Sequence, residues 1–83
     1  MRFPYPQVLS LARITPVSYK RLVKVFEKKG FRFVRQKGDH LIYSKEGVTR
    51  PLVIPRYDNI PVFVVLNNLR SAGISREEYL KLL

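Results

Sequence analysis

The chain has 83 residues, with 16 Lys and Arg against 6 Asp and Glu, and a formal net charge of +10. This length fits one domain with a small core. The lack of cysteine excludes disulfides and thiolate metal sites, a single histidine is too few for a structural zinc site, and we expect no cofactor. The positive charge favours a polyanionic partner, which is nucleic acid, an acidic protein or an anionic membrane surface.

We identify neither a membrane-spanning segment nor a signal peptide in the sequence. No apolar run approaches the roughly 18 residues of a membrane-spanning helix, and the proline-rich start does not resemble a signal peptide. We therefore expect a cytoplasmic protein with no membrane partner. Pro4 and Pro6 disfavour a helix around them, so we predict an arm over residues 1–14 and one domain over residues 15–83.

The first predicted helix begins with Thr15 as its N-cap and Pro16 at its first helical position. Gly30 suits the left-handed position that ends a helix. Between them, apolar residues recur at helical spacing and give one buried face, formed by Tyr19, Leu22, Val23, Val25 and Phe26. We interpret the lysines of the opposite face as solvated surface.

Three strands are predicted next, separated by a Gly-Asp turn and a Lys-Glu-Gly turn, over residues 31–37, 40–43 and 49–54. They form an antiparallel meander. Alternation along the second strand places His40 and Ile42 on one face, and Leu41 and Tyr43 on the other. If the second pair points into the core, His40 lies on the open face of the sheet.

The segment after the sheet has contested signals. Residues 62–65 have strand propensity, but we predict a helix because apolar residues recur at helical spacing until Gly73. Asp58 or Asn59 is the predicted cap, with Pro61 in the first turn. Phe63 and Val64 lie off the apolar stripe and suggest an interface.

A short last helix is predicted from a capping box, in which Ser75 is the cap and Glu78 its partner. The order of elements is therefore helix, three strands, helix and short helix. This order predicts an α+β fold with a three-stranded antiparallel sheet and both long helices on one face. By analogy, it is the α-β-β-β-α topology of double-stranded-RNA-binding domains.

Four short motifs follow one another along residues 15–75. They are Gly-Phe at 30–31, Arg-Gln-Lys-Gly-Asp-His at 35–40, Val-Ile-Pro-Arg-Tyr at 53–57, and Leu-Arg-Ser-Ala-Gly-Ile-Ser at 69–75. In this order they resemble the HicA family of toxin mRNA interferases. The resemblance implies the double-stranded-RNA-binding type of fold, ribosome-independent cleavage of mRNA and neutralisation by a HicB antitoxin. It also implies that His40 is the catalytic residue.

The sequence departs from the family pattern at three places. Asp39 replaces a serine, Tyr57 replaces a second histidine, and the apolar residues 62–64 replace small and polar ones. Asp39 adds a negative charge where phosphate approaches. It is either a turn former or a group that orients the imidazole of His40.

RNA is cleaved without a metal when a base takes the proton of the 2′-hydroxyl, a second group protonates the leaving oxygen, and cations stabilise the developing charge. Histidine is the side chain that titrates near neutral pH, so His40 is the candidate base. Arg35, Lys37 and Arg56 are candidate phosphate contacts. Tyr57 is a further candidate RNA contact and, with the lysines, a candidate acid.

Two other functions remain open at this point. The same fold can bind RNA through its charges without cutting it, which predicts strongly salt-dependent binding. Alternatively, the main ligand is an acidic antitoxin, and the apolar residues 62–64 form part of that interface. The oligomeric state is not indicated by the sequence.

Overall fold

The structure is a computed structural model that describes residues 13–83, so the predicted arm lies almost entirely outside the described residues. The elements in chain order are α2 (Tyr19–Lys28), β1 (Arg32–Lys37), β2 (His40–Ser44), β3 (Leu52–Pro55), α3 (Val62–Ala72) and α4 (Arg76–Leu82). This order, with a three-stranded antiparallel sheet, confirms the predicted α+β fold.

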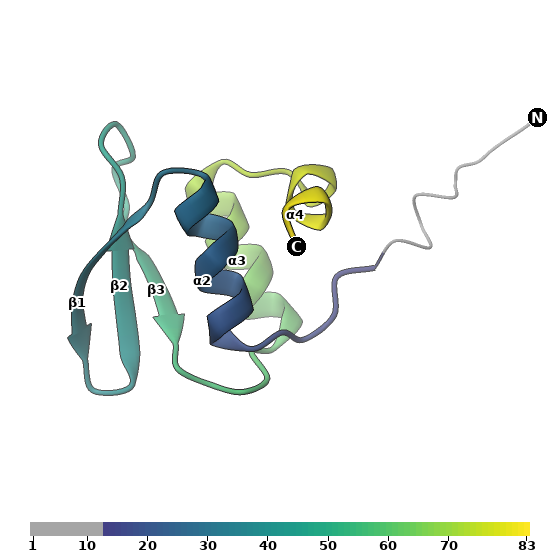
Figure 1. Ribbon diagram of the computed structural model, residues 1–83, viewed down its shortest axis with the longest axis horizontal. Helices are drawn as coiled ribbons and strands as arrows, with labels where there is room; N and C mark the ends of the chain where they lie inside the picture. Colours follow the sequence, from purple (N-terminus) through teal and green to yellow (C-terminus); the bar gives the residue numbers. More distant parts are fainter. Residues whose placement is uncertain (1–12) are drawn as a thin grey trace, which may run out of the picture.

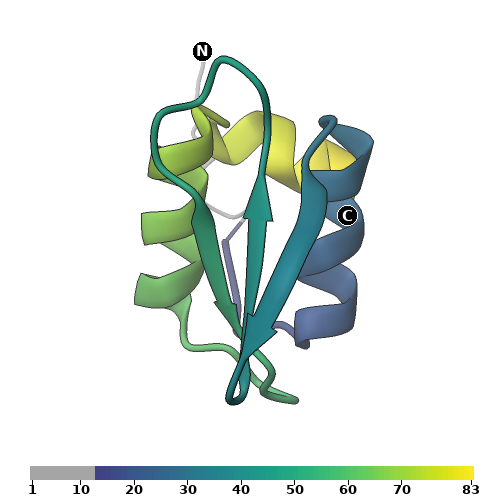
Figure 2. The ribbon, with the colours of Figure 1, turned by 90° about the vertical axis from the view of Figure 1, so that its left-hand side faces the viewer.

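The sheet and the helices form two layers. The strands lie in the order β1-β2-β3, and α2 and α3 both cover one face of the sheet, while no element of residues 13–83 covers the other, which we call the open face (Figures 1 and 2). The helix α4 lies beyond α2 and α3, on the side away from the sheet. The core fills the space between the layers, and its members with 0% exposure are Leu22, Phe26, Leu52, Ile54, Ile60 and Val65.

The first helix begins three residues later than predicted. Ser18, rather than Thr15, is the N-cap of α2, and its Oγ accepts from the Arg21 amide at 3.3 Å. The reason is tertiary, because Val17 forms an antiparallel bridge with Ile60. The Ile60 amide donates to the Val17 carbonyl at 2.7 Å. Such pairing requires extended backbone where the sequence alone favours a first helical turn.

Two further boundaries differ from the prediction. The strand β3 begins at Leu52 instead of residue 49, because the preceding Pro51 has no amide hydrogen to pair with β2. The helix α3 has Pro61 as its N-cap, and neither Asp58 nor Asn59 caps it. The contested segment from Val62 is helical, as predicted, and Gly73 ends it in the left-handed region with φ of +73°.

The last helix has the predicted cap but only half of the predicted capping box. The Oγ of Ser75 accepts from the Glu78 amide at 3.1 Å. The carboxylate of Glu78 instead pairs with Lys29 at the end of α2. This ion pair joins α4 to α2. Within residues 13–83, no helix has the length and apolar character needed to cross a membrane.

Candidate active site on the open face of the sheet

The side chains of β2 alternate between the two faces of the sheet in the way that a catalytic role of His40 requires. Leu41 and Tyr43 belong to the core between the sheet and the helices. His40 therefore lies on the open face, where its side chain is 45% exposed. Its direct neighbours across the sheet are Lys37 on β1 and Pro55 on β3.

A bulge in β1 brings a second predicted residue to this face. Phe33 pairs with Tyr43 on the core side of the sheet, and their rings meet edge to face with centroids 5.7 Å apart. In a regular strand Arg35 would share the face of Phe33. The register shifts between these two residues, so that Arg35 pairs with Ile42 instead. Arg35 and Lys37 consequently share the face of His40.

Three of the predicted site residues, Arg35, Lys37 and His40, line one open hollow, which we name the His40 hollow. Its apolar floor comes from β2, β3 and the residue before β3, namely Ile42, Val53 and Pro51. Its rim is polar and consists of Arg35, Lys37, Gly38, Asp39 and His40. The sequence alone does not indicate this floor, apart from Ile42, which alternation along β2 places on the same face as His40.

The imidazole of His40 has an acidic neighbour in the turn. The Nδ1 of His40 lies 2.9 Å from Oδ1 of Asp39, whose side chain is 63% exposed. The turn itself is braced, because Gln36 Nε2 donates to the Gly38 carbonyl at 2.8 Å. Gly38 has φ of +60°, a conformation that glycine adopts without strain.

Arg56 and Tyr57 lie outside the His40 hollow, on the loop after β3. The Arg56 amide donates to the Asp39 carbonyl at 2.7 Å, which fastens this loop to the turn before His40. The Arg56 side chain turns to α2, where its Nε donates to the Tyr19 hydroxyl at 3.2 Å. This hydrogen bond raises the pKa of Arg56 above its usual range. Tyr57 is 44% exposed. As RNA contacts, both residues stay predictions.

The loop also brings the beginnings of two helices to the same end of the molecule. The Tyr19 amide at the start of α2 donates to the Tyr57 carbonyl at 3.0 Å. Figure 1 shows the β1–β2 turn, this loop and the first turns of α2 and α3 all at its lower end. Helix N-termini carry partial positive charge. The end that holds His40 therefore combines two helix N-termini with the exposed carboxylates of Asp39 and Asp58.

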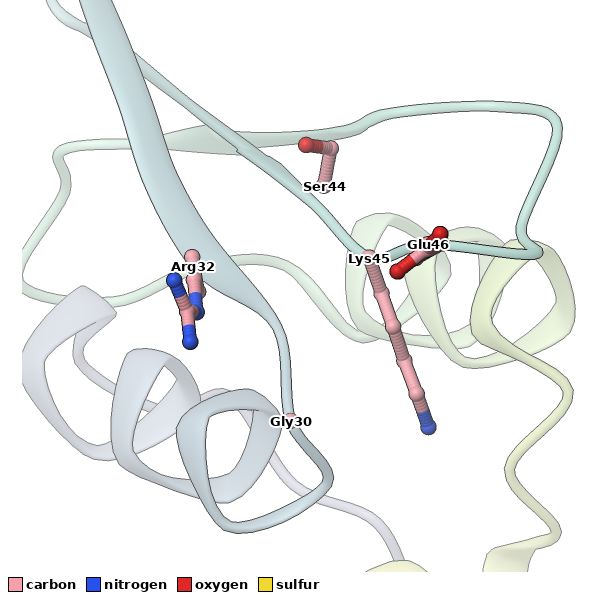
Figure 3. Close-up of a pocket in the computed structure, with 5 residues that line it drawn as sticks. All are labelled: Gly30, Arg32, Ser44, Lys45 and Glu46. Carbon is pink, nitrogen blue, oxygen red and sulfur yellow. The ribbon is translucent and has the colours of Figure 1, made fainter.

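A second hollow lies at the opposite end of the β1–β2 hairpin and is lined by Gly30, Arg32, Ser44, Lys45 and Glu46 (Figure 3). Its lysine has a structural partner, because the Nζ of Lys45 lies 5.7 Å from the centroid of the Phe31 ring. The stem of Lys45 passes close to Gly30, as Figure 3 shows. No residue predicted to act in catalysis lies here.

Residues 19–74 match the family model described as the HicA toxin of bacterial toxin-antitoxin systems. The chain belongs to this family. The match spans α2, the whole sheet and α3, and therefore includes the His40 hollow. Family membership makes the chain a toxin of a toxin-antitoxin system, with an antitoxin as its implied partner and RNA as its general target. Comparisons with curated proteins and with solved structures gave no match.

Proposed function

We propose that this HicA-family toxin is an endoribonuclease that cleaves mRNA without a metal, with His40 as its catalytic base. The observation that carries the proposal is the meeting of His40, Arg35 and Lys37 in one hollow of a chain from this family. The cations come from β1 and the base from β2, so the site is held by strands rather than by loops alone.

The reaction follows from the groups in the His40 hollow. The neutral imidazole takes the proton of a ribose 2′-hydroxyl, and the 2′-oxygen attacks the adjacent phosphorus. The bond from phosphorus to the 5′-oxygen breaks, which leaves a 2′,3′-cyclic phosphate and a 5′-hydroxyl. The ammonium group of Lys37 gives its proton to that oxygen, and Arg35 stabilises the charge on the phosphate.

The hollow favours an unpaired stretch of RNA as the substrate. Val53 is 44% exposed and, with Ile42, offers an aliphatic surface next to the cations. A base that has left its stack can cover this surface while its phosphate contacts Arg35 and Lys37. Bases inside a duplex cannot do so, because their faces are stacked on their neighbours.

We further propose that the partner is a HicB antitoxin and that both proteins act in the cytoplasm. A specific observation favours a protein partner beside the RNA. Phe63, in the first turn of α3, is 67% exposed, the largest exposure among the bulky apolar side chains of residues 13–83. An exposed aromatic residue of this size suits an interface. Charge complementarity with a chain of net charge +10 favours an acidic antitoxin.

The nuclease proposal is tested by incubating purified protein with unpaired and duplex RNA in EDTA. We expect the parent to cut the unpaired RNA and His40→Ala to be slower by about 10²–10⁴-fold, the usual contribution of a general base. His40→Gln keeps a polar side chain and should be equally inactive. Lys81→Ala, on the exposed side of α4, should cut like the parent.

Circular dichroism of each variant separates loss of chemistry from loss of fold. If the parent binds RNA but leaves it intact, the chain is an RNA-binding module without catalysis. If it neither binds nor cuts RNA, its main ligand is the antitoxin.

A further inference from the structure

We propose that Asp39 is a positioning residue that holds His40 in the tautomer with hydrogen on Nδ1, so that Nε2 carries the free lone pair. Its importance for catalysis rests on the nuclease function proposed above. The assignment of the tautomer is independent of that function and is measurable without RNA.

The short distance between the carboxylate and the ring favours one tautomer of His40. An ionised carboxylate only accepts hydrogen bonds, and Oδ1 of Asp39 lies 2.9 Å from Nδ1 of His40. A lone pair on Nδ1 would be repelled by that oxygen, so the charge of Asp39 favours the neutral ring with its hydrogen on Nδ1. A neutral imidazole carries one hydrogen, and the groups beside its two nitrogens decide which nitrogen holds it. Nε2 is then left as the proton acceptor.

The backbone that carries the two side chains is held on both sides. The carbonyl of Asp39 accepts from the Arg56 amide at 2.7 Å, and His40 is in register with Lys37 and Pro55. The carboxylate and the ring therefore project from a backbone whose geometry is fixed. Both side chains remain partly exposed, so we expect a modest effect on rate rather than an all-or-none one.

The charges around the pair explain how an acidic residue fits a phosphate site. Lys37 faces His40 across the strands, and Arg35 lines the same hollow. These two cations offset the carboxylate near the phosphate. Once His40 has taken a proton, Asp39 also stabilises the imidazolium. A serine at this position would supply neither the charge nor a group that only accepts hydrogen bonds.

The test is ¹⁵N NMR of the imidazole at a pH where the ring is neutral, and it is unambiguous because His40 is the only histidine of the chain. We expect the parent to show the Nδ1-H form as the major tautomer. In Asp39→Asn, whose amide group can donate to Nδ1, and in Asp39→Ala, we expect the Nε2-H form to become major. Asp58→Asn removes the same charge at an exposed position and is the matched control.

Integrity of the turn is read from the Arg56 amide, whose bond to the Asp39 carbonyl should survive a side-chain substitution. An Nε2-H majority in the parent, or a tautomer ratio that is unchanged in Asp39→Asn, would overturn the proposal.

Cleavage assays then connect the tautomer to the chemistry. We expect Asp39→Asn to lower the rate by about tenfold, the lower end of the effect known for groups that orient metal-bound histidines, while RNA binding is retained. A parent that shows the Nδ1-H form but does not cut RNA contradicts the nuclease function and leaves the positioning contact established. If the parent cuts RNA but its His40 is mainly in the Nε2-H form, the role of Asp39 is contradicted and the nuclease function is not.

Discussion

The hydroxyl of Tyr79 is buried and has no hydrogen-bond partner among residues 13–83. The Tyr79 side chain on α4 is 1% exposed and belongs to the core. Burial raises the pKa of Tyr79 above the usual value for tyrosine, although the charge of Arg21 acts in the opposite direction. Folding therefore favours the neutral phenol but leaves a buried donor without an acceptor.

This hydroxyl gives a prediction for stability. An unsatisfied buried polar group is costly, so Tyr79→Phe should raise the free energy of unfolding by about 1 kcal/mol. Because the folded-state pKa is raised, the stability linked to Tyr79 is present below about pH 10, the usual tyrosine value, and is lost as the pH rises through the raised pKa. Tyr79→Phe should therefore also weaken the alkaline loss of stability.

Urea unfolding from pH 7 to pH 11 measures both effects. Tyr57→Phe is the control, because Tyr57 is 44% exposed and should leave the free energy of unfolding unchanged. A destabilised Tyr79→Phe would show that the hydroxyl has a partner.

Some site residues could be predicted from the sequence, and others could not. The glycine turn, the basic residues before it and the alternation of β2 were enough to place His40, Arg35 and Lys37 as candidates. The direction of the Arg56 side chain could not be predicted in this way, because it forms a hydrogen bond with Tyr19, 37 residues earlier. No local pattern reports a contact of this kind.

At the scale of elements, the bulge in β1 decides the composition of the candidate site. Periodicity alone places Phe33, Arg35 and Lys37 on one face of the strand. The bulge separates them, so that Phe33 stays beside Tyr43 while the two cations reach the face of His40. Bulges depend on how two strands pair, and no signal within β1 predicts this one.

The start of α2 gives a second test at this scale. Ser18→Ala should lower the free energy of unfolding by about 1 kcal/mol, because it removes the bond to the Arg21 amide. Thr15→Ala, at the cap that the sequence favoured, should have almost no effect, because Thr15 is exposed. Chemical denaturation of the two variants beside the parent decides between the caps. A larger loss from Thr15→Ala would restore the earlier start.

For the whole molecule, element order and hydrophobic periodicity were sufficient to predict the fold. Each helix or strand has its own periodic pattern of apolar residues, and a helix–strand–strand–strand–helix chain has few ways to bury all of these apolar faces. The contacts that position the start of α2 and the loop after β3 join segments far apart in the sequence. The Val17–Ile60 bridge and the Arg56–Asp39 bond are examples, and they depend on packing that no single segment encodes.

The net charge of +10 gives a prediction for RNA binding. Each phosphate neutralised on single-stranded RNA contributes about −0.7 to the slope of log affinity against log salt. Replacing Arg35 and Lys37 together with glutamine should therefore make the slope less steep by about 1.4. Binding is measured in the His40→Ala background so that the RNA stays intact.

The matched control replaces Lys20 and Lys24, which are exposed on α2, with glutamine. This control should leave the slope close to that of the parent. If it changes the slope more than the Arg35 and Lys37 pair does, RNA lies along α2 instead of on the open face of the sheet.

The two edges of the sheet differ in a way that matters when many copies of the chain are present. On β3, the Val53 carbonyl accepts from Asn68 Nδ2 at 3.2 Å, Pro55 has no amide hydrogen, and its carbonyl accepts from the Tyr57 amide at 2.9 Å. On β1, the bulge and the cations discourage another strand. Both edges of the folded sheet therefore disfavour the addition of a strand from another copy of the chain.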